Sequence, residues 1–198
     1  MTTYAPELVL HIQVSFSDPA KLRVDVRAEN RSQHEIYWLN RFWTVVKGGQ
    51  TAWDPRGPYR HEKGGVLRLL YGVAPVPSGT DVNNRYIPQA TRIAPGAAAE
   101  EHTEIAVPVE EFALFEPPSA KTEYELVEVE SVAVIAHYVA PGDGIVIAPS
   151  FVDPAYFWVK APDQKVRVAE AIVAADRKIP VRRRKDEIAR VLLSNEKP

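Results

Sequence analysis

The sequence predicts an all-β protein, folded as an antiparallel β-sandwich with long loops. Apolar residues occupy every second position over residues 8–16 and again over residues 22–28, and most positions between them are polar. Successive side chains on a strand point to opposite faces, so this pattern indicates a β-hairpin with one buried face. The chain also contains 17 Pro and only 10 Gly. This balance favours many short strands joined by fixed loops.

The chain after this hairpin predicts further short strands and two long loops. Residues 35–47 are rich in aromatic and β-branched residues, which indicates one bent strand or two short ones. Residues 66–71 are a short apolar segment and predict another strand. The flanking stretches 51–65 and 72–92 are expected to be loops, because Pro, Gly and Asn interrupt them repeatedly.

The second half of the chain continues the strand pattern. Apolar residues alternate over residues 103–109, where Pro108 on the other face indicates an edge strand. Residues 124–139 predict a long strand whose apolar phase slips near Ser131, as a β-bulge would cause. Further short strands are expected over residues 145–147 and 151–160.

The C-terminal residues predict a last strand followed by a short helix. For residues 166–175 both structures are open, because the Ala content favours a helix whereas the even spacing of β-branched residues favours a strand. We favour the strand. Residues 186–194 predict a helix, because Asp186 is suited to its first turn and apolar residues follow at helical spacing.

Together these segments predict one domain. About nine strands with turns between them are typical of an immunoglobulin-like sandwich, which we assign to residues 1–164. Residues 165–198 are expected to form a basic C-terminal extension packed on the same domain. The segment Leu22–Ser32, with the aromatic strand after it and Ile93–Gly96 before an alternating strand, resembles the pattern of bacterial immunoglobulin-like and fibronectin-like modules. This resemblance implies a fold and no activity.

Composition limits the class of protein further. The chain has 198 residues, of which 45% are hydrophobic and 25% charged, and its net charge is −2, as expected of a folded globular protein. It contains no Cys, which excludes disulfides, Cys-ligated zinc and thiol nucleophiles. The N-terminal residues lack the basic and apolar regions of a signal peptide, and no apolar run is long enough for a membrane helix. We therefore expect a cytoplasmic protein without a membrane partner.

Charge is distributed unevenly along the chain. Residues 1–164 carry 14 basic and 21 acidic residues, whereas residues 165–198 carry 10 basic and 5 acidic ones. The strongest basic run is a candidate interaction site and consists of Arg182, Arg183, Arg184 and Lys185. Two uses of this run are open besides a solvated surface: contact with nucleic acid or another anionic surface, and pairing with the Glu-rich residues 100–130 of the same or a neighbouring subunit. We do not expect nucleic acid, because the protein as a whole is acidic and no aromatic residues interleave with the basic run.

The loop after residue 50 holds the richest candidate ligand site. Its aromatic and charged residues lie close together in the sequence: Trp53, Asp54, Tyr59, Arg60, His61 and Glu62. Aromatic rings beside carboxylates and Arg are suited to binding sugars or peptides, because a ring offers contact area and the charges give direction. The alternative is that Trp53 and Tyr59 anchor the loop to the core while the charges are solvated.

No catalytic motif accompanies these residues. The five His show no metal-ligand spacing, and the chain has neither a nucleophile elbow nor a phosphate-binding Gly-rich loop. We therefore expect no metal, no cofactor and no enzyme of these classes, although a catalytic site of scattered residues stays open. The first hypothesis is a non-catalytic module that binds a protein partner or assembles into a homo-oligomer. The alternative is a carbohydrate-binding or glycan-acting protein that uses the loop 53–62.

Overall fold

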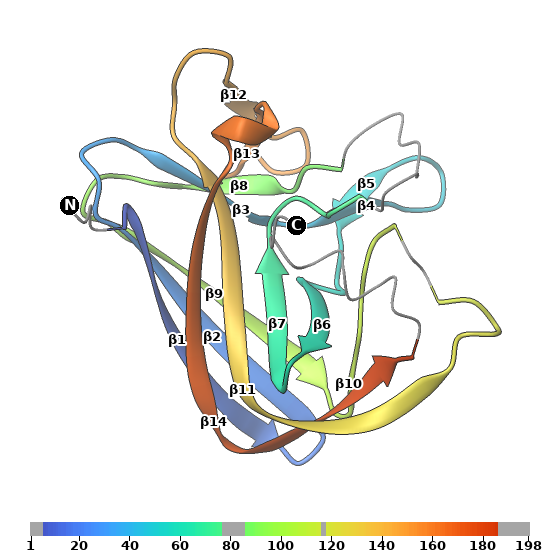
Figure 1. Cartoon of the computed structure of the whole chain (residues 1–198). Helices are drawn as coiled ribbons and strands as arrows, with labels where there is room; N and C mark the ends of the chain where they lie inside the picture. Colours follow the sequence, from blue (N-terminus) through green and yellow to red (C-terminus); the bar gives the residue numbers. More distant parts are fainter. Residues whose placement is uncertain (1–5, 77–85, 116–117, 186–198) are drawn as a thin grey trace.

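The computed structural model describes residues 6–76, 86–115 and 118–185, and in these ranges the protein is built from strands (Figure 1). The only helical element in the described ranges is a short 3₁₀ turn, Asp163–Lys165. The predicted all-β class is therefore confirmed. The helix predicted over residues 186–194 lies outside the described residues.

The predicted N-terminal hairpin forms two strands of a three-stranded antiparallel sheet. β1 (Leu8–Asp18) pairs with β2 (Lys21–Asn30), and β2 pairs with β9 (Ala98–Ala106). The register places Phe16 opposite Leu22, so the alternating apolar positions of both strands share one face. The apolar residues of β2 on this face are all buried: Leu22, Val24, Val26 and Ala28.

A nine-stranded sheet forms the second layer of a sandwich-like fold. Its strand order is β10–β14–β11–β3–β8–β13–β12, and β7 pairs with both β11 and β6. The strands are β3 (Ile36–Arg41), β6 (Tyr59–Lys63), β7 (Val66–Tyr71), β8 (Gln89–Ile93), β10 (Val109–Glu110), β11 (Tyr124–Val139), β12 (Val146–Pro149), β13 (Phe157–Lys160) and β14 (Arg167–Arg184). The main core lies between the two sheets, where residues of β2 meet those of β7, β11 and β14.

The two longest strands, β11 and β14, pair with each other and run the length of the molecule (Figure 1). Their register shifts between Val129 and Ser131, where the sequence predicted a bulge. Residues 167–175 are strand rather than helix, because the edge of β11 supplies their backbone partners. Most of the predicted C-terminal extension is therefore a strand inside the large sheet.

Two pairs of strands depart from the antiparallel arrangement that we expected. β7 runs parallel to β11, and β10 runs parallel to β14. Parallel neighbours need a long connection between them, and the chain from β7 to β11 supplies one by passing through β8 in the large sheet and β9 in the small sheet. The fold is thus all-β and sandwich-like, with two parallel strand pairs in its large sheet.

The first predicted long loop is partly strand. Its start forms β5 (Thr51–Trp53), which pairs with β4 (Trp43–Val45), and its end forms β6, which pairs with β7. The sequence of β6 does not alternate between polar and apolar residues, because tertiary neighbours cover both of its faces: Tyr59, His61 and Glu62 are all buried. No helix in the described part of the chain is both long and apolar enough to cross a membrane.

Strand β3 connects the two parts of the core. Trp38 packs in the main core with Tyr71, whereas Tyr37 and Leu39 belong to a second, smaller cluster around β8 and β13. Residues of one strand that alternate between two cores are buried on both faces. β3 ends in two polar residues, Asn40 and Arg41, which line the candidate site together with residues of β9.

Candidate functional site

A cavity of about 220 Å³ lies where the end of β3, the connection from β5 to β6, and the middle of β9 meet. Its wall combines acidic, basic, amide and aromatic side chains from segments far apart in the sequence. The residues that line it are Asn40, Arg41, Phe42, Trp53, Asp54, Pro55, Gly57, Pro58, Tyr71, Glu101, His102, Thr103 and Glu104.

The register of β9 explains how polar groups reach this cavity. Val26 of β2 lies opposite Glu101 of β9, and Val24 lies opposite Thr103. Paired residues of antiparallel strands point to the same face, so Glu101 and Thr103 share the inward face with these buried valines. The hydroxyl groups of Thr103 and Tyr71 are hydrogen bonded at 2.7 Å. β9 therefore presents polar side chains between the sheets at its middle.

Glu101 is the centre of a hydrogen-bonded cluster. Asn40 Nδ2 donates to Glu101 Oε2 at 3.1 Å, and Arg41 Nη1 lies 3.0 Å from the same oxygen. Asn40 Oδ1 in turn accepts from the backbone N–H and the hydroxyl of Thr91, which fixes the orientation of the amide. Burial raises the pKa of Glu101, and the charge of Arg41 opposes this effect without cancelling it.

Asp54 is the second carboxylate of the cavity and has a different environment. Arg56 Nε lies 2.9 Å from Asp54 Oδ1, and the backbone N–H of Arg56 donates to the same oxygen at 3.0 Å. Burial by itself would raise the pKa of Asp54, but these hydrogen bonds and the charge of Arg56 outweigh burial and lower it. The two carboxylates therefore differ in acidity, with Asp54 the stronger acid.

Trp53 lines the cavity and packs against Tyr156, and we call these two rings the aromatic rim. The side chain of Trp53 is 37% exposed, and its ring meets that of Tyr156 at 5.3 Å and 81°. The Arg41 guanidinium lies over the other ring of this pair, 4.7 Å from the centroid of Tyr156. Tyr156 thus contacts both Trp53 and the cation that holds Glu101, which connects the aromatic rim to the polar cluster.

The structure divides the six residues of the predicted loop site. Trp53 and Asp54 line the cavity. Tyr59 is buried between Phe42 and Phe112, which is the anchoring role that we gave as the alternative for this residue. The other three residues do not line the cavity: His61 and Glu62 are buried in β6, and Arg60 donates to the backbone carbonyls of Glu110 and Arg56.

Sequence reasoning missed Asn40, Arg41 and Glu101. Extending the alternating pattern of residues 103–109 backwards by one period would have placed Glu101 on the inward face of β9. A charged residue at an inward position is the signal that was available for this site. No such signal exists for Asn40 or Arg41, because they follow an aromatic strand as ordinary surface residues would.

The basic run pairs with acidic residues of the same chain. Arg183 contacts both Glu62, at 2.7 Å, and Glu125, at 2.5 Å. Arg182 pairs with Glu110, and Lys185 pairs with Glu123 at 3.0 Å; the backbone N–H of Arg184 donates to Glu111. Most of these partners lie in the Glu-rich residues 100–130, the segment that we gave as one possible partner of the basic run.

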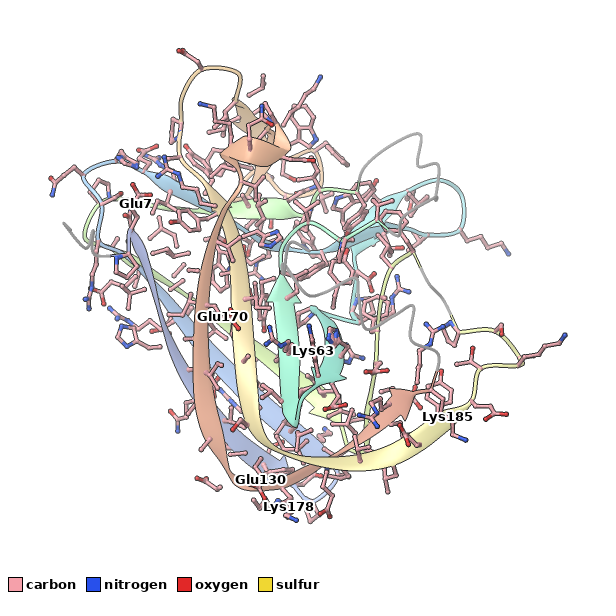
Figure 2. All side chains as sticks on the ribbon, in the orientation of Figure 1. Glu7, Lys63, Glu130, Glu170, Lys178 and Lys185 are labelled. Atoms are coloured by element: carbon pink, nitrogen blue, oxygen red, sulfur yellow. The ribbon has the colours of Figure 1, made fainter. Side chains whose placement is uncertain are left out.

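The pairing continues along the same two strands. Lys178 lies 3.1 Å from Glu128, and Figure 2 shows Lys178 close to Glu130 where β11 and β14 bend, with Lys185 further along the same edge. Within the described ranges, no group of three or more His, Asp and Glu side chains is placed to hold a metal ion.

Comparison with known proteins adds no family to these observations. No protein-family model, curated protein or solved structure matches the chain.

Proposed function

We propose that the protein is a binding module for a small polar ligand, and that its binding site is the cavity at the end of β3. One observation carries the proposal: Glu101, an ionisable residue, lies on the inward face of β9 and lines an open cavity. Removing a carboxylate from water costs free energy. An apolar residue at this position would stabilise the sandwich better, so the carboxylate fits a role in binding.

The organisation of the cavity supports this role. Several polar groups on its wall are held by a second group: Asn40 by Thr91, Asp54 by Arg56, and Thr103 by Tyr71. Side chains held in this way lose little conformational entropy when a ligand binds. A cavity with a few oriented polar groups, an aromatic rim and carboxylates of perturbed pKa is typical of ligand sites.

The test is a ligand-observed NMR screen of the full chain against a fragment library with neutral, anionic and cationic members. We expect hits whose binding is lost in Trp53→Ala. Trp158→Ala is the matched control, because Trp158 is 36% exposed, close to the 37% of Trp53, and does not line the cavity. Hits that disappear equally in both variants, or a complete absence of hits, would contradict the proposal.

A second candidate function is self-association through an exposed apolar surface, which is the role that we expected for an immunoglobulin-like module. Phe151 is 65% exposed, and its ring lies 6.1 Å from Trp43 of β4, the strand that also carries the exposed Val45. Large exposed apolar side chains that gather in one region are typical of protein-binding surfaces.

Sedimentation velocity over a range of protein concentrations tests this second candidate. We expect concentration-dependent dimers that Phe151→Ser abolishes. Leu126→Ser is the control, because Leu126 is also 65% exposed but lies on β11. A monomer at every concentration, or equal effects of both variants, would argue against self-association.

A further inference from the structure

We propose that the ligand of this cavity is a neutral sugar, bound as a single ring. This inference rests on the proposed function and names the class of ligand for the same site.

The charges of the cavity wall are balanced within the protein. Each acidic side chain already has a cationic partner in the protein: Glu101 has Arg41 at 3.0 Å, Asp54 has Arg56 at 2.9 Å, and Glu104 has Lys21 at 3.7 Å. A charged ligand would have to give up its hydration to enter a site that has no excess charge to attract it. The charge balance therefore favours a neutral ligand.

The cavity wall retains a free hydrogen-bond acceptor. Glu101 Oε1 lies 3.4 Å from Arg41 Nη1, which is too long for a strong hydrogen bond, so this oxygen retains capacity as an acceptor. Glu101 lines the cavity, so the ion pair offers this acceptor to a ligand.

This acceptor favours a ligand group that donates a hydrogen bond. An ionised carboxylate ligand cannot donate to Glu101, and an ammonium ligand would add a positive charge to a wall whose charges are already paired. A hydroxyl group donates one hydrogen bond and accepts others. A ligand hydroxyl can therefore donate to Glu101 Oε1 and remain neutral.

Glu101 and Trp53 line the same small cavity. An exposed indole ring provides an apolar surface for the C–H groups of a sugar ring, whose hydroxyl groups point outward from its edge. The cavity of about 220 Å³ is below the ~300–1,000 Å³ of pockets for drug-sized ligands. Its size fits one sugar residue better than a longer glycan.

Titration followed by tryptophan fluorescence and ligand-observed NMR tests the inference on the full chain. The probes are the methyl glycosides of glucose, galactose, mannose and N-acetylglucosamine, together with methyl glucuronide and methyl glucosaminide as charged counterparts. We expect at least one neutral glycoside to bind at least tenfold more tightly than either charged probe. We also expect Glu101→Gln to weaken that binding at least tenfold.

Glu100→Gln is the control for loss of negative charge, since Glu100 is the neighbour of Glu101 in β9 and lies opposite Arg27 on the other face. It should leave binding unchanged, and circular dichroism checks that both variants are folded. If fragments bind at Trp53 but no neutral glycoside does, the ligand class is wrong and the proposed function stands. If neither fragments nor glycosides bind, both fail. Tighter binding of a charged probe also overturns the inference.

Discussion

The ion pairs of the basic run predict very different effects on stability for residues that look alike in the sequence. Arg183 contacts Glu62, whose side chain is only 4% exposed, and it also contacts Glu125. Replacing Arg183 by Ala would leave the Glu62 carboxylate buried without its cation. Breaking a buried pair in this way costs about 3–5 kcal/mol.

Two features of the structure reduce this value. The Arg183 side chain is itself 25% exposed, and the backbone N–H of Gly65 still donates to Glu62 Oε1 at 2.7 Å after the substitution. We therefore expect Arg183→Ala to lower the free energy of unfolding by about 2–3 kcal/mol.

Lys185→Ala is the matched control. Lys185 lies two residues further along the chain, and its pair with Glu123 has side chains that are 52% and 74% exposed. Exposed pairs contribute less than about 1 kcal/mol. Urea unfolding of the wild type and both variants, followed by circular dichroism, measures the difference. An Arg183→Ala loss no larger than that of Lys185→Ala would refute the assignment of Arg183 and Glu62 as a buried structural pair.

Three further predictions concern the cavity and the core. Gly57 has a φ of +72°, so Gly57→Ala should destabilise the protein by ~1–2 kcal/mol. Gly142→Ala is the control and should leave stability unchanged, because φ is ordinary there and space is open. Equal unfolding midpoints of the two variants would contradict this prediction. Because folding raises the pKa of Glu101, the wild type should lose stability as the pH rises from the ordinary Glu pKa through the raised value. Glu101→Gln should remove this loss. The variant should therefore be more stable than the wild type at neutral pH and equally stable in acid. A variant less stable than the wild type at neutral pH would count against the raised pKa of Glu101. Leu69→Ala in the main core should cost ~2–5 kcal/mol, measured by urea unfolding, and a loss below 1 kcal/mol would show that the site repacks.

Local patterns predicted much of the fold. The hairpin of β1 and β2, the irregularity of β11 near Ser131 and the strand that we favoured over residues 166–175 all follow from the spacing of apolar residues. This spacing is a property of each strand by itself, so it can be read without knowing the neighbouring strand. The predictions failed where burial came from distant segments, as in β6, which has no alternating pattern because neighbours cover both faces.

In the candidate site too, residues that are neighbours in the sequence were predicted, and contacts between distant residues were not. Trp53 and Asp54 were predicted because they stand together in the sequence, whereas Arg41 and Glu101 were not, since they are 60 residues apart. Their contact depends on two facts of tertiary structure: the pairing of β9 with β2, which turns Glu101 inward, and the position of β3 in the other sheet, which brings Arg41 to it.

The sequence by itself determined that the chain forms strands with one buried face, and it located the turns between most of them. Only the tertiary structure decided that β7 lies parallel to β11, that the basic run is paired within the chain, and that Glu101, Arg41 and Trp53 share a cavity. The physical reason is that a strand encodes its own two faces through the order of its residues. The neighbour on each edge is selected by the packing of the whole sandwich.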